Sequence, residues 1–244
     1  MGTSRILRKK IRDRAFALAT FWMGYVAHEG VKLSLRGASP RVRYRLFKDY
    51  EADDVRLCRA LLEPGDRVLE LGTAIGFLAI YCLRYLGVER FAGVEANSGL
   101  REIMADNFRV NDVPMPRLIH AAVGPVRGTA RFHVSRDYFS SSMRGDSASG
   151  VTIEVPQMTI PDVLAELDFT PNVLIMDIEG TEVDLPVPDL CRFDKILAEF
   201  HGRKVGQDRV DALLQQLKEA GFQVVAQQGP SLALSRVSTG RPGT

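Results

Sequence analysis

Largely apolar runs of strand length alternate with amphipathic segments along most of the chain, a pattern typical of a doubly wound α/β sheet. Runs with few polar interruptions are typical of strands covered on both faces of a parallel sheet. We predict five such strands, at residues 68–71, 91–95, 117–122, 173–177 and 195–199. We predict the intervening helices at residues 50–63, 75–86, 98–110, 161–167 and 207–220.

Two further pairs of segments have the character of antiparallel strands. Residues 222–226 and 231–235 would close the sheet at its C-terminal end. Residues 129–135 and 151–157 alternate apolar and polar positions and would form an inserted hairpin. The serine-rich segment 136–150 between them would be either a lid over a site or a simple hairpin tip.

The pattern divides the chain into three parts. Residues 50–237 are predicted to form a Rossmann-like domain with a mostly parallel sheet and an antiparallel C-terminal strand. Residues 1–49 form a helical N-terminal arm, and residues 238–244 a flexible tail. A length of 244 residues suits one α/β domain of ordinary size with a short appendage.

Residues 15–27 of the arm are uncharged and follow a basic stretch. The run is shorter than the roughly 20 apolar residues that cross a bilayer. We expect a helix that packs on the domain or lies on a membrane surface, and an export signal is the third alternative. The same segment could provide a homodimer contact.

Charge is unevenly distributed although the net charge is only +2. Residues 1–48 carry twelve Lys and Arg residues against two acidic ones. This balance suggests contact with an anionic surface such as lipid or nucleic acid, and a solvated basic arm is the alternative.

The composition, with 45% hydrophobic and 25% charged residues, is that of a globular protein. Three cysteines without metal-type spacing are consistent with a reducing, cytoplasmic location, with membrane association as an alternative.

The first predicted strand runs into a turn flanked by glycines, Glu70-Leu-Gly-Thr-Ala-Ile-Gly76. Ligands of open α/β sheets bind beyond the carboxyl ends of the strands, where Glu70, Glu95 and Asp177 are also expected. A dinucleotide fingerprint would need glycine at residues 71 and 73, which are Leu and Thr here. The turn therefore favours a nucleoside ligand without a pyrophosphate, with Glu95 accepting hydrogen bonds from both ribose hydroxyls.

Five short blocks resemble the FkbM-type S-adenosylmethionine-dependent methyltransferases. They are the turn at 70–76, Val94-Glu-Ala-Asn97, Ala121-Ala-Val-Gly124, Met176-Asp-Ile-Glu-Gly180 and Glu199-Phe-His201. The resemblance covers residues 64–204 and implies a class I methyltransferase fold, S-adenosylmethionine as cofactor and O-methylation of hydroxyl groups. The cofactor contacts it implies are Glu70, Gly72, Thr73, Ala74, Gly76, Glu95, Ala96, Ala121 and Asp177.

The chain departs from the family pattern at three places. Ala74 stands where the family has Asn, and Glu70 replaces an Asp. Ala96 stands where a proline follows the ribose-binding acid. Pro186 and Pro188 interrupt the helix that follows the Asp-Ile-Glu-Gly block.

Methylation of an alcohol needs a base near the methyl group, because the hydroxyl must lose its proton. Asp177, Glu179, Glu199 and His201 follow two strands that are expected to be neighbours, and we predict them as the catalytic residues. His201 is the expected base, oriented by Asp177 or Glu199. The same donors could instead hold Mg²⁺, although we predict no metal.

The sequence thus predicts a methyltransferase that acts on a hydroxyl of a small molecule, natural product or glycan. The alternatives are N-methylation of a nucleic acid or protein, and a module that binds the nucleoside without catalysis. No recognisable nucleic-acid module accompanies the basic arm, and the acceptor is not encoded in any motif.

Overall fold

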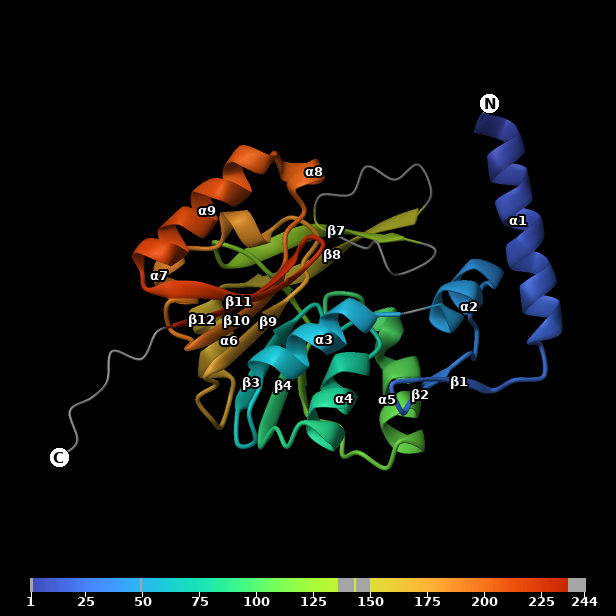
Figure 1. The fold of residues 1–244 in the computed structure, drawn as a ribbon, viewed down its shortest axis with the longest axis horizontal. Coiled ribbons are helices and arrows are strands. Elements are labelled where there is room, and N and C mark those ends of the chain that lie inside the picture. Colours follow the sequence, from blue (N-terminus) through green and yellow to red (C-terminus); the bar gives the residue numbers. More distant parts are fainter. Residues whose placement is uncertain (1, 49, 136–142, 144–149, 237–244) are drawn as a thin grey trace.

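The computed structural model describes residues 2–48, 50–135, 143 and 150–236, with the backbone alone for residues 2–10 and 135. Its centre is a seven-stranded sheet in the order β11-β12-β10-β9-β3-β4-β5 (Figure 1). The parallel strands are β3 (Arg67–Leu71), β4 (Arg90–Val94), β5 (Arg117–Ile119), β9 (Val173–Met176) and β10 (Lys195–Glu199). The antiparallel strands are β11 (Phe222–Gln228) and β12 (Ser231–Arg236).

Helices cover both faces of this sheet. One apolar core lies under α3 (Ala52–Leu61), α4 (Phe77–Tyr85) and α5 (Arg101–Val110). A second lies under α6 (Ile160–Ala165), α7 (Val187–Leu190) and α9 (Gln207–Glu219). The short elements are η1 (Ser98–Leu100), η2 (Glu182–Asp184) and α8 (Gly202–Val205). The predicted fold class, mostly parallel with an antiparallel C-terminal pair, is confirmed.

The predicted strand at 117–122 is wrong as a single element. Residues Arg117–Ile119 stay in the main sheet, whereas β6 (Ala122–Val123) leaves it to pair with β8 (Gly150–Met158). The inserted hairpin is confirmed, since β7 (Gly128–Ser135) pairs antiparallel with β8. The predicted lid at 136–150 lies almost wholly outside the described residues, and so does the tail at 238–244.

The N-terminal arm contains two helices and a hairpin, namely α1 (Gly2–Ala19), β1 (Tyr25–His28), β2 (Val31–Ser34) and α2 (Pro40–Phe47). The expectation of one helix over residues 15–27 is therefore wrong beyond Ala19. Helix α1 packs on α2, with the Phe16 ring edge-on to the rings of Tyr44 and Phe47. No helix among the described residues has the length and apolar character that crossing a membrane would need.

Two buried asparagines, Asn107 of α5 and Asn111 at its C-terminal cap, attach the arm to the domain. Asn107 accepts a hydrogen bond from the Ser34 amide at 2.7 Å and donates to the Ile75 carbonyl at 2.9 Å. Asn111 accepts from the Lys32 amide and donates back to the Lys32 carbonyl. β2 pairs with β1, and these further bonds tie β2 to the domain, so the arm is part of the folded unit.

Replacement of the first of these asparagines tests that attachment. Asn107→Ala leaves two backbone groups in the protein interior without a partner, and each such group costs about 1–3 kcal/mol. We expect the free energy of unfolding, measured by urea titration, to fall by about 3 kcal/mol. The matched control Gln215→Ala removes an exposed side chain of α9 and should change it by less than about 0.5 kcal/mol. Equal stability of both variants would contradict the proposed attachment.

Candidate functional site

Parallel strands β3, β4, β9 and β10 end at the same edge of the sheet. The pairing of Leu71 with Val94 and Met176 brings Glu70, Glu95 and Asp177 together there. They surround a cavity of about 380 Å³. It is lined by the following residues: Arg45, Lys48, Tyr50, Glu51, Ala52, Asp53, Asp54, Glu70, Leu71, Gly72, Thr73, Ala74, Leu78, Glu95, Ile175, Met176, Asp177, Glu179, Leu197 and Glu199.

The turn after β3 passes directly against the loop after β9. Gly72 has a φ of 90°, and a β-carbon at this position would overlap the backbone oxygen of Asp177. Only glycine fits this close approach without strain. Ala74 has a φ of 47°, a left-handed conformation that an asparagine adopts more readily than an alanine.

Glu95 connects the two loops that border the cavity. Its Oε2 accepts a hydrogen bond from the Ala74 amide at 2.9 Å, and its Oε1 accepts one from the Asn97 amide at 2.6 Å. Burial raises the pKa of Glu95 to about 7, although these backbone donors favour the charged form. A ligand that offers two hydroxyl donors would meet an acceptor already held in place from both sides.

The remaining predicted cofactor residues occupy different positions. Gly72, Glu95, Ala96, Ala121 and Asp177 line a second, smaller cavity of about 40 Å³ that borders the inserted hairpin. Gly76 lines neither of these two cavities. It begins α4 with a φ of 80°, and a β-carbon there would press on Phe108.

Glu70 is the most deeply buried carboxylate that faces the cavity, with 4% of its surface exposed. Burial, together with the charges of Glu95 and Asp177, raises its pKa to about 8. Its Oε2 has no hydrogen-bond partner among the described residues. An unpaired buried acceptor is costly, and a positively charged ligand group would relieve that cost.

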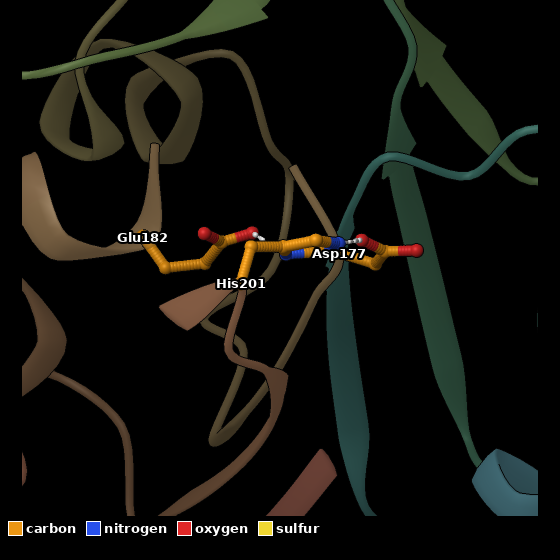
Figure 2. A group of neighbouring side chains, drawn as sticks. All are labelled: Asp177, Glu182 and His201. Carbon is orange, nitrogen blue, oxygen red and sulfur yellow. Dashed lines mark ion pairs between the residues drawn. The ribbon is translucent and has the colours of Figure 1, made fainter. Parts of the chain in front are cut away.

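His201 lies between Glu182 and three of the carboxylates that line the cavity. Figure 2 shows its ring between Glu182 on one side and Asp177 on the other. Nε2 is 3.3 Å from Glu179, 3.6 Å from Asp177 and 3.8 Å from Glu199, and Nδ1 is 3.6 Å from Glu182. All four predicted catalytic residues are therefore brought together.

The charges around His201 decide its protonation. Burial alone would lower the pKa of the imidazole, but Glu182, Asp177 and Glu179 outweigh it and raise the pKa to about 9. Withdrawal from water and the neighbouring Glu199 charge raise the pKa of Asp177 well above its ordinary value. His201 and Asp177 therefore bind protons more tightly here than the same side chains would in water.

The sequence analysis did not include Glu182 among the site residues. The side chain is fully buried and accepts hydrogen bonds from the Ile178 and Gly180 amides, both at 2.8 Å. It thereby fixes the turn in which Glu179 has a left-handed φ of 58°. The only sequence signal was an acid two residues after the Asp-Ile-Glu-Gly block.

Two further groups near the cavity were also missed. Lys204 of α8 forms an ion pair with Glu179. Glu51 and Asp54, at the start of α3, form the wall opposite the sheet, and burial raises the pKa of Asp54 to about 6. Their positions depend on how α3 packs, which no local pattern indicates.

A metal could bind at one place among the described residues. Asp177, Glu182 and His201 offer ligand atoms that all lie within 4.8 Å of one another. Both Glu182 oxygens already accept backbone hydrogen bonds, which favours a structural role for this carboxylate.

The residues fit a cofactor that is a cationic nucleoside. The acid-rich lining and the unpaired Oε2 of Glu70 suit a sulfonium and an ammonium group, and Glu95 suits a ribose. The small cavity beside Ala96 and Ala121 is apolar apart from its two acids. Together with the strand order, this defines a Rossmann-like methyltransferase site.

Comparison with known protein families identifies the family to which this chain belongs. The chain matches the model described as the methyltransferase FkbM domain over residues 70–224, which is more than half of its length. The chain therefore belongs to the FkbM methyltransferase family and is an S-adenosylmethionine-dependent methyltransferase.

Among curated proteins, the chain is similar to the protein-lysine N-methyltransferase EFM3 of Chaetomium thermophilum. The two are 28% identical over 123 residues, which is 48% of this chain and 35% of the relative. The match thus spans about a third of that relative's length.

Solved structures with a similar backbone include other methyltransferases. The ribosomal protein L11 methylase of Lactobacillus delbrueckii subsp. bulgaricus is 16% identical, with a TM-score of 0.46 over 78% of this chain and 80% of that one. TYW2 of M. jannaschii in complex with AdoMet is 11% identical, with a TM-score of 0.45 over 87% and 86%. At these scores we draw no argument from either.

The raised pKa of Glu70 makes the stability of the unliganded protein depend on pH. The unfolded chain releases this proton near the ordinary pKa of 4.5, whereas the folded protein holds it up to about pH 8. The folded state binds more protons in this window, so the free energy of unfolding falls as pH rises from 4.5 to 8.

Glu70→Gln should remove the loss of folding stability that the wild type shows as pH rises. We expect the variant to be more stable than the wild type by roughly 3 kcal/mol at pH 8, with a smaller difference at pH 5. The measurement is urea unfolding at several pH values, with exposed Glu154→Gln as the control that leaves the pH dependence unchanged. Parallel pH curves for wild type and Glu70→Gln would show that this carboxyl is not perturbed.

Proposed function

We propose that this methyltransferase transfers the methyl group to a hydroxyl oxygen of a small molecule, natural product or glycan. The observation that carries the proposal is the placement of His201. Its Nε2 lies nearest the carboxylates that line the cavity, and its Nδ1 faces the fully buried Glu182. In this arrangement Nε2 would face the acceptor, and Nδ1 lies 3.6 Å from the Glu182 carboxylate.

The cofactor would be held by the residues around the turn after β3. Glu95 would accept the ribose hydroxyls, and Glu70 would bind the charged amino-acid end. Gly72, Thr73 and Ala74 would contribute backbone groups, and Ala96 and Ala121 would flank the base. S-adenosylmethionine supplies a methyl group on a positively charged sulfur, which makes the methyl carbon electrophilic.

His201 would accept the hydroxyl proton of the acceptor at Nε2. Its neutral form is the reactive one, and Glu182 at Nδ1 would fix the tautomer and then stabilise the imidazolium. Glu182, which sequence reasoning did not include, thus takes the orienting role that was expected of Asp177 or Glu199. Asp177, Glu179 and Glu199 would orient the acceptor, and their negative charge keeps the histidine pKa near 9.

N-methylation of a lysine side chain is a second candidate, and two observations favour it. One is the partial similarity to a protein-lysine N-methyltransferase. The other is the acid-rich lining of the cavity, which suits a cationic side chain. The two candidates differ in the bond that is formed, so they are separable by product analysis.

Transfer of an isotope-labelled methyl group tests the function directly. The purified protein is incubated with methyl-labelled S-adenosylmethionine and an extract of its source cells, separated into small-molecule, glycan and protein fractions. We expect label in a methyl ether of the small-molecule or glycan fraction, identified by mass spectrometry. Label on lysine nitrogen would instead establish the second candidate, and His201→Gln serves as the negative control.

The pH dependence of the rate tests the catalytic assignment. We expect kcat/KM to rise with pH through an inflection near pH 9 and to level off above it, because this parameter reports the base of the free enzyme. His201→Gln should lower the plateau by about 10²–10⁴-fold. Glu182→Gln removes a negative charge, so it should move the inflection to lower pH and reduce the rate.

The matched control is His133→Gln, on the inserted hairpin, which should leave the profile unchanged. A wild-type rate that is flat between pH 7 and 10, or a Glu182→Gln profile with an unshifted inflection, would be evidence against His201 as the base. The shift in pH profile separates positioning by Glu182 from a general loss of stability.

A further inference from the structure

The end of α1 and the link to β1 carry an exposed apolar surface that the proposed chemistry does not use. We call Leu18, Phe21, Trp22 and Met23 the apolar tip. Trp22 is 90% exposed, Leu18 76%, Phe21 65% and Met23 43%. In Figure 1 this link lies at the right-hand edge of the molecule, far from β11 and β12. Single exposed apolar residues are ordinary, but a contiguous group marks an interaction surface.

Hydrogen bonds hold the backbone of the tip in place. The Thr20 hydroxyl donates to the Phe16 carbonyl at 2.8 Å, and Arg43 of α2 donates to the Thr20 carbonyl at 2.7 Å. Phe21 and Trp22 pack edge to face, with ring centroids 5.3 Å apart. The rings are therefore presented outward by a braced turn, in spite of the cost of their contact with water.

The surroundings of the tip are positively charged. Of the two acidic residues among residues 1–48, Asp13 pairs with Arg12 and Glu29 pairs with Arg59. Arg14, which is exposed, lies on the same helix as Leu18, and exposed Arg36 follows β2. The arm thus presents apolar side chains within an excess of basic charge.

We propose that the apolar tip and the basic residues around it form a docking surface for an anionic lipid bilayer. Trp and other large apolar side chains enter the boundary between headgroups and acyl chains, while Lys and Arg bind anionic headgroups. A second copy of this chain fits the surface less well, because pairing two such arms would bring like charges together.

The docking surface is connected to the catalytic cavity through α2. Arg43 braces the tip, and Arg45 and Lys48, two and five residues further along, line the cavity. A bilayer bound at the tip would therefore lie on the α2 side of the site. The proposal concerns where the protein binds, and it does not depend on which acceptor is methylated.

Trp22 provides a direct probe, because it is the only tryptophan of the chain. The full chain is mixed with phosphatidylcholine vesicles or with vesicles that also contain about 30% phosphatidylglycerol. With the anionic vesicles we expect the emission to move to shorter wavelength, quenching by acrylamide to weaken, and the protein to sediment with the lipid. Neutral vesicles should bind at least about tenfold less protein.

Variants separate the apolar and the charged parts. Phe21→Ser keeps the fluorescent probe and should weaken binding by at least about tenfold. Arg14→Gln and Arg36→Gln should each weaken it by about fivefold, and added salt should do the same. The control Val126→Ser alters a side chain that is 63% exposed and distant in sequence from the arm, and should bind like the wild type.

Four results would overturn the proposal. Three are an unchanged Trp22 emission with anionic vesicles, equal binding to neutral ones, and lipid-free self-association that Phe21→Ser abolishes. The fourth is binding of an RNA in preference to the vesicles. Phe21→Ser should keep wild-type methyl transfer to a water-soluble acceptor, so failure of the docking proposal and failure of the proposed function are distinguishable.

Discussion

The crowding of carboxylates at the carboxyl edge of the sheet is the constraint on which the site depends. Parallel strands β3, β9 and β10 end side by side, so Glu70, Asp177 and Glu199 all line one cavity. Each carboxylate needs a proton, a backbone donor or a cation to remain there. Glu95 and Glu182 use backbone amides, whereas Glu70 keeps its proton. The edge is thereby prepared for a positively charged ligand.

Much of the fold follows from the sequence because the signals are local. The strand at 173–177 is a continuous apolar run, and the turn at 70–76 carries glycines where the backbone needs positive φ. These features determine which side chains end at the ligand edge. The three other predicted catalytic residues meet around His201 for that reason.

The errors arise where distant segments decide the structure. Residues 117–122 look like one strand, but β6 leaves the main sheet because it pairs with β8, more than twenty-five residues further along the chain. The apolar run at 15–27 ends as a strand because β2 is available to pair with Tyr25–His28. No local pattern marks Glu182, and only the turn around it shows that its carboxylate is fully buried.

The same crowding bears on the choice between oxygen and nitrogen as methyl acceptor. An ammonium group would bind well among these carboxylates, but their charge would also raise its pKa and oppose the loss of the proton that methylation requires. A hydroxyl carries no charge before the reaction, so binding meets no such conflict. The pKa of His201 is already near 9, so the histidine can hold the one proton that a hydroxyl gives up. Removing a further proton from a cationic acceptor suits this site less well. The electrostatics that retain the cofactor therefore favour a neutral acceptor.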